Sequence, residues 1–244
     1  VALLYNGEIS TYREPRAELE TKGYRFRTTC DGEVICHLYR EKGDDLFEHL
    51  DGMFAAALWI RDEQKLLLAR DLPGEKPLYY SRPRGDLVFA SELAALTRFP
   101  QVDTTLDRQA LWDFPTFLWV PEPATVYREI SALERGHVLI AQAGRVTVRP
   151  YRNRFNREPL VGTGDDAVIA ETRSVVEEAI RTRLLSHVGV GCFLSSGLDS
   201  SSMRGSASAS SVRTTAPAPR RISVHSSAGD AQTGRPTPGW VGRG

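Results

Sequence analysis

The chain has 244 residues, of which 41% are hydrophobic and 25% are charged, and its 31 basic residues balance its 31 acidic residues. This composition is typical of a globular protein with one large or two small domains, and zero net charge argues against nucleic acid or an anionic membrane as the main partner. No apolar run is long enough to cross a bilayer, no signal peptide is visible, and the three cysteines lack metal-type spacing. We therefore expect a cytoplasmic protein with reduced thiols.

Residues 1–140 alternate between short helical and strand-like segments. A strand is expected over residues 2–5, ending in a turn at Asn6-Gly7, and helices are expected over residues 12–22, 31–42 and 45–50. Two hairpins follow, the first joining 53–60 to 65–69 and the second joining 78–81 to 87–90, and Ser91 is expected to cap a helix over 92–98. Residues 100–135 have the composition of a connecting region, and a third hairpin joins 137–142 to 145–148. This order predicts an α+β domain with helices covering antiparallel strands.

The next segment has a different pattern. A long helix is expected from Asp165 or Asp166 to about residue 186, with a buried stripe that includes Val168, Ile169, Val175 and Val176. An apolar run over residues 188–192 follows and is typical of a buried strand. A helix that leads into a buried strand indicates the start of a parallel α/β domain, so the predicted fold class is α+β followed by α/β.

Residues 193–201 carry the most informative motif, a strand that ends in Ser-x-Gly-x-Asp-Ser and leads into a helix. Backbone N–H groups and the dipole at a helix N-terminus favour a bound anion, glycine allows close approach, and hydroxyls add donors. The motif therefore predicts a phosphate-binding loop. Its candidate ATP-binding residues are Leu194, Ser195, Ser196, Gly197, Asp199 and Ser200.

Residues 204–244 contain no Leu, Phe, Tyr, Lys or Glu, and Asp230 is their only acidic residue. Such a segment buries too little apolar surface to offset the loss of chain entropy, so a disordered tail is expected. Two origins stay open, a natural disordered tail or translation of a GC-rich gene in the wrong frame. The expected organisation is thus one domain over 1–140, the start of a second over 160–203, and a tail over 204–244.

Six segments in the right order resemble asparagine synthetase of the glutamine-hydrolysing kind. They are Asn6-Gly7-Glu8-Ile9 with Tyr12-Arg13, Asp31–Ile35, Leu50–Ala55, Arg70-Asp71 with Lys76–Tyr80, Phe89–Leu93 and Phe193–Ser201. The resemblance implies an N-terminal-nucleophile glutaminase with an αββα sandwich, followed by an adenine-nucleotide α-hydrolase-like synthetase domain. In that family a cysteine releases ammonia from glutamine, and ATP with Mg²⁺ activates aspartate as an aspartyl adenylate that ammonia converts to asparagine.

The resemblance also implies roles for single residues. Asn6 and Gly7 would form the oxyanion hole, because an amide side chain and a backbone N–H are suitable donors to a tetrahedral oxyanion. Glu8 and Asp31 would hold the α-amino group of glutamine, although Asp31 alone could simply be a helix cap. In the second domain the loop residues would hold ATP, with Asp199 near Mg²⁺. Arg70, Asp71 and Lys76 are expected to be structural, in a loop tied by ion pairs.

The chain departs from the family pattern at several positions. Residue 1 is Val where the family has its cysteine nucleophile, and Ser196 replaces a loop glycine. We therefore expect a truncated fragment, with a homodimer of the family type as a further expectation, that by itself catalyses neither half of the reaction. Two alternatives stay open: a relative with another acceptor, such as a β-lactam synthetase, and a non-catalytic module that binds glutamine or ATP.

Overall fold

The computed structural model describes residues 1–152, 164–184, 192–194, 197–200 and 224–226. The chain divides into two compact units, Val1–Glu158 and Pro159–Gly244. Among the helices in these ranges, none is both long and apolar enough to cross a membrane.

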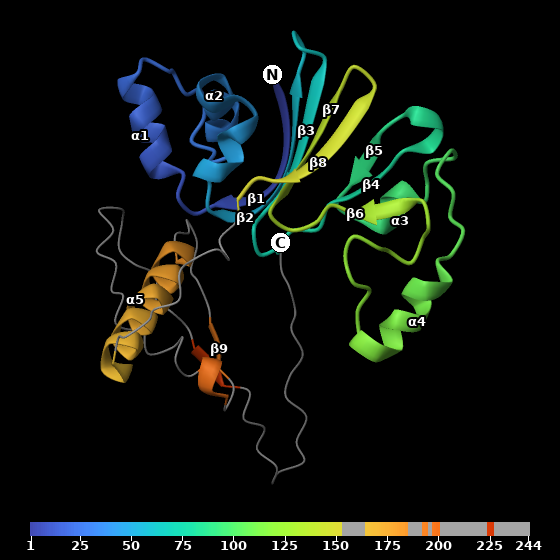
Figure 1. The fold of residues 1–244 in the computed structure, drawn as a ribbon. Coiled ribbons are helices and arrows are strands. Elements are labelled where there is room, and N and C mark those ends of the chain that lie inside the picture. The colour runs from blue at the N-terminus through green and yellow to red at the C-terminus, as the bar shows by residue number, and fades with distance from the viewer. Residues whose placement is uncertain (153–163, 185–191, 195–196, 201–223, 227–244) are drawn as a thin grey trace, which may run out of the picture. The chain divides into compact units, whose positions relative to one another are not determined.

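A five-stranded sheet forms the centre of the first unit (Figure 1). Its strands follow the order β1-β2-β3-β7-β8, and every neighbouring pair is antiparallel. The strands are β1 (Ala2–Ile9), β2 (Gly52–Ile60), β3 (Lys65–Arg70), β7 (His137–Gln142) and β8 (Arg145–Pro150). In the described part of the chain β1 pairs only with β2, so β1 is an edge strand whose whole length is held from one side.

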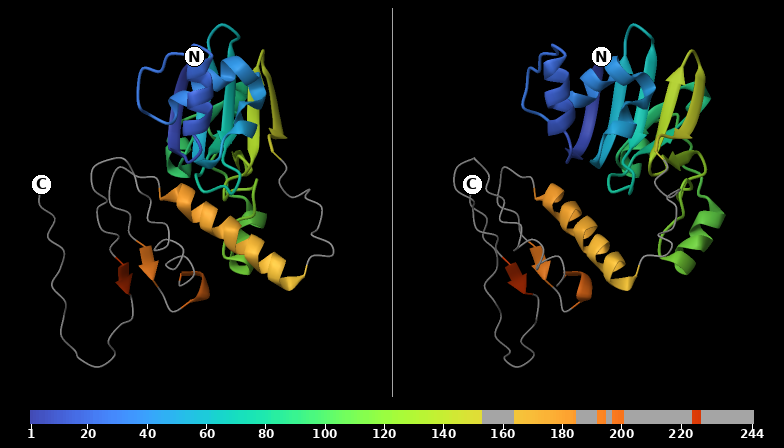
Figure 2. Two further views of the ribbon diagram at one scale, coloured as in Figure 1. Left: turned by 90° about the vertical axis from the view of Figure 1, so that its left-hand side faces the viewer. Right: turned by 60° about the vertical axis from the view of Figure 1, so that its left-hand side comes forward.

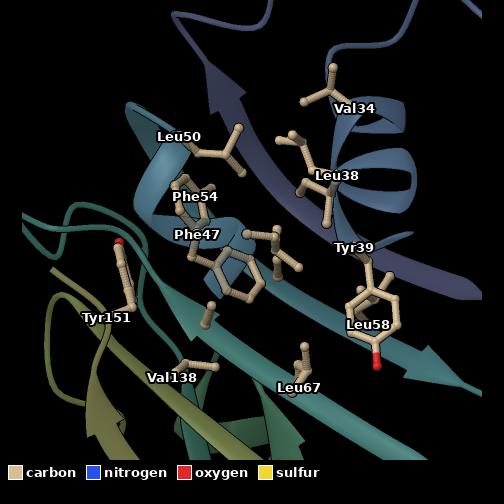
Figure 3. Packing of buried hydrophobic residues seen from close by; sticks show 14 of the residues in the cluster. Val34, Leu38, Tyr39, Phe47, Leu50, Phe54, Leu58, Leu67, Val138 and Tyr151 are labelled. Carbon is tan, nitrogen blue, oxygen red and sulfur yellow. The ribbon is translucent and has the colours of Figure 1, made fainter. Parts of the chain in front are cut away.

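One face of this sheet is covered by α1 (Arg13–Thr21), α2 (Glu33–Lys42) and the 3₁₀ helix η1 (Gly43–His49). The helix α2 forms because its apolar residues recur on one stripe, and it ends at Gly43, whose φ is +57°. That stripe, Val34, Ile35, Leu38 and Tyr39, packs with Phe47 of η1 against alternate residues of the strands. Figure 3 shows the side chains of α2 and η1 meeting those of Phe54, Leu58, Leu67 and Val138.

The opposite face of the sheet packs against a second, three-stranded sheet. This sheet has the order β5-β4-β6 and is built from β4 (Tyr79–Ser81), β5 (Val88–Ala90) and β6 (Ile130–Ala132), with the 3₁₀ turn η2 (Pro83–Gly85) between the first two. Leu68 and Leu139 of the large sheet meet Leu78 and Leu133 in this inter-sheet core. The strand β2 is buried on both faces, which explains its nearly continuous apolar sequence.

A fourth layer lies on the outer face of the small sheet, where α3 (Leu93–Leu96) packs against Ile130 through Leu96. The helix α4 (Arg108–Phe117) follows, and Asp107 caps it by accepting hydrogen bonds from the N–H groups of Gln109 and Ala110. Helices, five-stranded sheet, three-stranded sheet and helix therefore stack in the α-β-β-α order that was expected, as Figure 1 shows for the first unit. The left view of Figure 2 shows α1 and α2 in front of the large sheet.

The described part of the second unit includes α5 (Asp165–Arg183), a helical turn at residues 198–200 and two short strands, β9 (Cys192–Leu194) and β10 (Val224–Ser226). The two strands pair in parallel, with Cys192 opposite Val224. The strand β10 lies within the segment for which a disordered tail was expected, and most of that segment lies outside the described residues.

Four local predictions were wrong. The strand β1 runs through Asn6-Gly7 instead of turning there, because all eight of its residues pair with β2. Ser91 does not cap α3, whose N-cap is Glu92 with no side-chain hydrogen bond. Both α4 and β6 occur where only a connection was expected. The apolar stripe of α5 is not buried, and Ile169 and Val175 are 58% and 59% exposed.

Candidate functional site

Two glycines bring β1 and β2 unusually close together at the first predicted site. In Gly7 φ is +151°, and a Cβ atom added there would lie 2.0 Å from the carbonyl oxygen of Met53. A Cβ added at Gly52 would lie 2.2 Å from the carbonyl oxygen of Glu8. Neither position accepts a side chain unless the strands move apart, so both glycines are required by the packing of the backbones.

Asp31 is tied to the same stretch of β1. One carboxylate oxygen, Oδ2, accepts hydrogen bonds from the Tyr5 hydroxyl at 2.7 Å and from the Ile9 backbone N–H at 2.6 Å. These two donors flank the predicted site residues 6–8. The other oxygen, Oδ1, has a single long contact of 3.6 Å with the Cys30 thiol. Asp31 therefore fixes its position through Oδ2 and keeps Oδ1 available.

The structure rules out the simpler role for Asp31 as a helix cap. The residue before α2 is Gly32, and no side chain caps this helix. The Tyr5 ring also packs closely on the α2 entry, because a Cβ at Gly32 would lie 2.9 Å from the Tyr5 Cδ1 atom. Burial and then the hydrogen bond to Asp31 raise the pKa of Tyr5, so its hydroxyl stays protonated and acts as the donor.

The side chains of Asn6 and Glu8 lie differently from that of Asp31. Both are exposed, and they alternate along β1 with Tyr5, Gly7 and Ile9. Among the described residues no hydrogen bond joins Asp31 to Asn6 or Glu8, whereas its bond to the Ile9 N–H places its carboxylate beside the backbone that follows Glu8. The structure thus brings the four predicted glutamine-binding residues to one end of the β1–β2 pair without linking their side chains.

A buried carboxylate in the loop after β3 supports this end of the sheet by binding the backbone of β2. Asp71 is fully buried and accepts hydrogen bonds from the backbone N–H groups of Phe54, Glu75 and Lys76. Phe54 lies directly opposite Gly7 in the β1–β2 register. Asp71 therefore connects the loop after β3 with the backbone that faces Gly7.

The neighbouring Arg70 is the other anchor of that loop. Its guanidinium forms an ion pair with Glu122 at 2.7 Å and donates to the carbonyl groups of Gly74, Lys76 and Leu133. The expectation of a structural loop tied by an ion pair is confirmed for Arg70, whereas Asp71 works through backbone N–H groups instead.

The second predicted site is only partly described. Leu194 ends β9, Gly197 and Asp199 are exposed, and the Ser200 hydroxyl donates to the carbonyl of Gly197 at 3.1 Å. Ser195 and Ser196 lie outside the described residues. Within the described ranges no group of three or more His, Cys, Asp or Glu side chains is arranged to hold a metal ion.

Two regions of the chain match known family models. Residues 1–152 match the model of the glutamine amidotransferase domain, and residues 171–230 match the model named asparagine synthase. The first match covers more than half of the chain. The chain therefore belongs to the glutamine amidotransferase domain family.

Similar curated proteins carry the corresponding names. The chain is 38% identical over 200 residues to asparagine synthetase (glutamine-hydrolyzing) 1 of Bacillus subtilis, covering 82% of this chain and 31% of the relative. It is 33% identical over 202 residues to asparagine synthetase (glutamine-hydrolyzing) 3 of the same organism, covering 82% and 33%. Amidase chyE of Penicillium rubens is 31% identical over 206 residues, covering 82% and 30%. The chain thus spans about a third of the length of the curated relatives it matches.

Sequence reasoning missed two features of the first site. Tyr5 was not named, and Asp71 was named only as part of a loop tied by ion pairs, not as an acceptor for the backbone N–H of Phe54. Tyr5 is 26 residues from Asp31, and the hydrogen bond between them depends on α2 packing beside β1. The alternation of Tyr5 with Asn6 along the strand could have placed its side chain on the helix-covered face, but no motif marks its partner.

Proposed function

We propose that the first unit is the glutamine-binding domain of a glutamine-dependent asparagine synthetase with an N-terminal-nucleophile fold. In this proposal the domain binds glutamine and the complete enzyme releases ammonia from it. The second unit is the start of a synthetase domain in which ATP and Mg²⁺ activate aspartate as an adenylate. The two family matches and the two groups of motif residues support this assignment.

The observation that carries the proposal is the attachment of Asp31 to β1. With Oδ2 taken by the Tyr5 hydroxyl and the Ile9 N–H, Oδ1, whose partner is the weak thiol donor of Cys30, is suited to accept a charge-assisted hydrogen bond from the α-ammonium group of glutamine. Glu8 supplies a second carboxylate at the same end of β1. Because Glu8 alternates with Tyr5 along β1, its side chain leaves the opposite face of the strand from the Tyr5–Asp31 contact, so Asp31 is the main partner of the ligand ammonium in this proposal.

Asn6 and Gly7 take the oxyanion role in this proposal. The Asn6 side chain is exposed on β1, and Gly7 adds no side chain that could hinder a ligand. An amide N–H pair aimed at a tetrahedral oxyanion stabilises charge that develops in the transition state. Since Gly7 is fixed by its close approach to Met53, its N–H would be preorganised before glutamine binds.

We assign no nucleophile among the cysteines with described side chains. The Cys30 thiol contacts Asp31, and Cys36 packs partly buried against the main core, where burial raises the pKa of its thiol. The raised pKa opposes an activated thiolate at Cys36. We therefore expect this chain by itself to bind glutamine without hydrolysing it.

In the second unit we assign the ATP pyrophosphate to the segment from Leu194 to Ser200. The segment begins at the end of β9 and includes a helical turn at residues 198–200. Ser195, Ser196, Gly197 and Ser200 would hold the phosphates, Leu194 would contact the nucleotide, and Asp199 would lie near Mg²⁺. Ser196 stands where the resembled family has glycine, and its hydroxyl can add a donor.

Calorimetric titration tests the glutamine site. We expect the chain to bind L-glutamine more tightly than glutaramate, the analogue that lacks only the α-amino group, and to release no glutamate. Asp31→Asn should remove this preference, because the amide leaves the ammonium without a negative partner.

The matched control is Asp103→Asn, which changes an exposed aspartate that bonds only within its own turn to Thr105. It should retain the preference for glutamine. Equal affinity of the unchanged chain for glutamine and glutaramate would contradict the assignment of Asp31.

A further inference from the structure

A polar pocket lies on the first unit outside the glutamine site. It has a volume of about 740 Å³ and is bounded by the segment between α1 and α2, the outer part of α2 and the start of β1. Its ionisable lining includes four cations and two carboxylates: Lys22, Arg25, Arg27, Arg40, Glu33 and Glu41. A cluster with excess positive charge is notable in a chain whose total charge is zero.

The two carboxylates of this pocket are already occupied. Glu41 accepts hydrogen bonds from the Tyr24 hydroxyl at 2.7 Å and from Lys22 at 2.9 Å. Glu33 accepts from the backbone N–H groups of Arg27 and Thr28 and from the Thr28 hydroxyl. Neither acidic group forms an ion pair with the three arginines, and the cations of the lining outnumber its carboxylates by four to two.

The same contacts shape the pocket. By binding two successive N–H groups, Glu33 of α2 pins the segment that carries Arg27 to the helix. Lys22 bridges Glu18 of α1 and Glu41 of α2, with both distances at 2.9 Å. Charged side chains thus hold the walls of the pocket in place, and none of these contacts involves an arginine side chain.

Three guanidinium groups remain. Arg25, Arg27 and Arg40 are exposed, and within the part of the chain that the structure describes none of them has an ion-pair or side-chain hydrogen-bond partner. Each guanidinium presents several donors in a fixed planar fork that matches phosphate oxygens, and it stays charged at all physiological pH values. Three such groups around one pocket can contact one ligand together.

The remaining lining indicates the kind of ligand. Its apolar part is small, and the largest aromatic side chain, Tyr24, already uses its hydroxyl for Glu41. The volume is within the usual range of about 300–1,000 Å³ for small-molecule sites, but little apolar surface is present to bury a base or a ring. A compact and highly charged ligand fits this lining better than a nucleoside.

From these observations we infer that the pocket formed by Arg25, Arg27 and Arg40 between α2 and the preceding segment is a binding site for a compact polyanion that bears phosphate groups. The site is separate from the proposed glutamine site and does not depend on it. Its ligand is recognised by forked hydrogen bonds from guanidinium groups to phosphate oxygens.

The test uses the full chain and inorganic pyrophosphate as the probe, titrated calorimetrically at about 0.15 M salt, where long-range attraction between exposed charges is screened. EDTA is included to remove divalent ions. The triple variant R25A/R27A/R40A should lose this binding site, with affinity reduced by about thirtyfold or more, because three charge-assisted contacts are removed. The variant R25K/R27K/R40K, which keeps the charge but loses the fork, should bind with intermediate affinity.

The matched control is R82A/R98A/R145A, which removes the same charge from exposed arginines outside the pocket. It should change the affinity by less than about twofold, since screened charges at a distance contribute little. Circular dichroism checks that all the variants keep the fold, which we expect because the changed side chains have no partners among the described residues.

Several results would overturn the inference. One is that the unchanged chain does not bind pyrophosphate, and another is that the pocket and control variants lose affinity equally. A third is that the pocket variant keeps its full affinity, which would place the binding in another segment such as residues 194–200. Citrate binding as tightly as pyrophosphate would also overturn it, because the ligand would then be recognised by charge alone.

Discussion

Gly7 on β1 has the most constrained backbone of the proposed glutamine site, and Gly7→Ala tests how closely β1 and β2 are held together. Its φ is +151°, and an added Cβ would lie 2.0 Å from the Met53 carbonyl oxygen and 2.6 Å from the Phe54 Cα. Both obstructing atoms belong to the backbone, so no rotation of a side chain relieves the contact. The strands must move apart, and this disturbs the ladder that holds the edge strand.

The magnitude has two parts. A backbone conformation that L-residues rarely adopt costs about 1–3 kcal/mol, and overpacking a tight site costs about another 1–3 kcal/mol. We therefore expect Gly7→Ala to lower the free energy of unfolding by about 2–6 kcal/mol. Gly23→Ala is the matched control, because its φ is +90° and nothing lies within 4 Å of the added Cβ. Gly23→Ala should lower the free energy of unfolding by the backbone part alone, about 1–3 kcal/mol.

Both variants can be measured by urea unfolding followed by far-ultraviolet circular dichroism, with the slopes compared to ensure that the same transition is observed. Gly7→Ala should be less stable than Gly23→Ala by about 1–3 kcal/mol, which is the overpacking part alone. Equal unfolding midpoints for the two variants would refute the close approach of β1 and β2 at Gly7.

Three further predictions concern the residues around this site. Asp71→Ala removes the acceptor of three backbone N–H groups and should lower the free energy of unfolding by about 3 kcal/mol or more in the same urea assay, whereas a loss below about 1 kcal/mol would contradict its anchoring role. Burial raises the pKa of Glu33, but hydrogen bonds from Thr28 and from the backbone outweigh burial and lower this pKa from 4.5 to about 2. The ionised Glu33 therefore stabilises the fold fully above about pH 4.5, and this stabilisation is lost as the pH falls towards 2. Glu33→Gln should flatten stability over that window in an acid titration followed by circular dichroism, and an unchanged slope would exclude this carboxylate as the cause. Tyr5→Phe should weaken glutamine binding by about tenfold, because Asp31 loses a hydrogen bond that orients it, while glutaramate affinity should not change; equal loss for both ligands would indicate a structural role only.

Much of the layered fold follows from local sequence pattern. The hairpin of β2 and β3 was predicted because two apolar runs flank a short polar turn. In the structure the two strands pair antiparallel, with Ala55 opposite Arg70 at one end and Ile60 opposite Lys65 at the other. The helix α2 was predicted from its apolar stripe and from Gly43 at its end. These signals succeed because the residues that determine each element lie within the element itself.

The errors arose where distant partners decide the structure. Asn6-Gly7 is a strong local turn signal, but β2 pairs with residues on both sides of it and keeps the strand extended. The strand β6 has only three residues and forms because β4 is available to pair with it. The helix α4 contains Pro115, which favoured a loop when only local preference was considered, yet the Asp107 cap starts a helix there.

The sequence motifs name candidate site residues but do not predict how those residues are arranged. The motifs marked Asn6, Gly7, Glu8 and Asp31, and the structure places them at one end of the β1–β2 pair. What holds Asp31 in place could not be predicted, because its partners Tyr5 and Ile9 are 26 and 22 residues away. Contacts across such separations are made by tertiary packing.

The proposed glutamine site can be tested directly by titrating the ¹⁵N-labelled chain with L-glutamine and following the backbone amide resonances. The proposed site predicts that the largest shifts occur at Asn6, Gly7, Glu8, Ile9 and Asp31, and that Asp31→Asn abolishes them. Shifts confined to other segments, or no shifts anywhere in the described chain, would contradict the assignment of this end of β1 as a glutamine site.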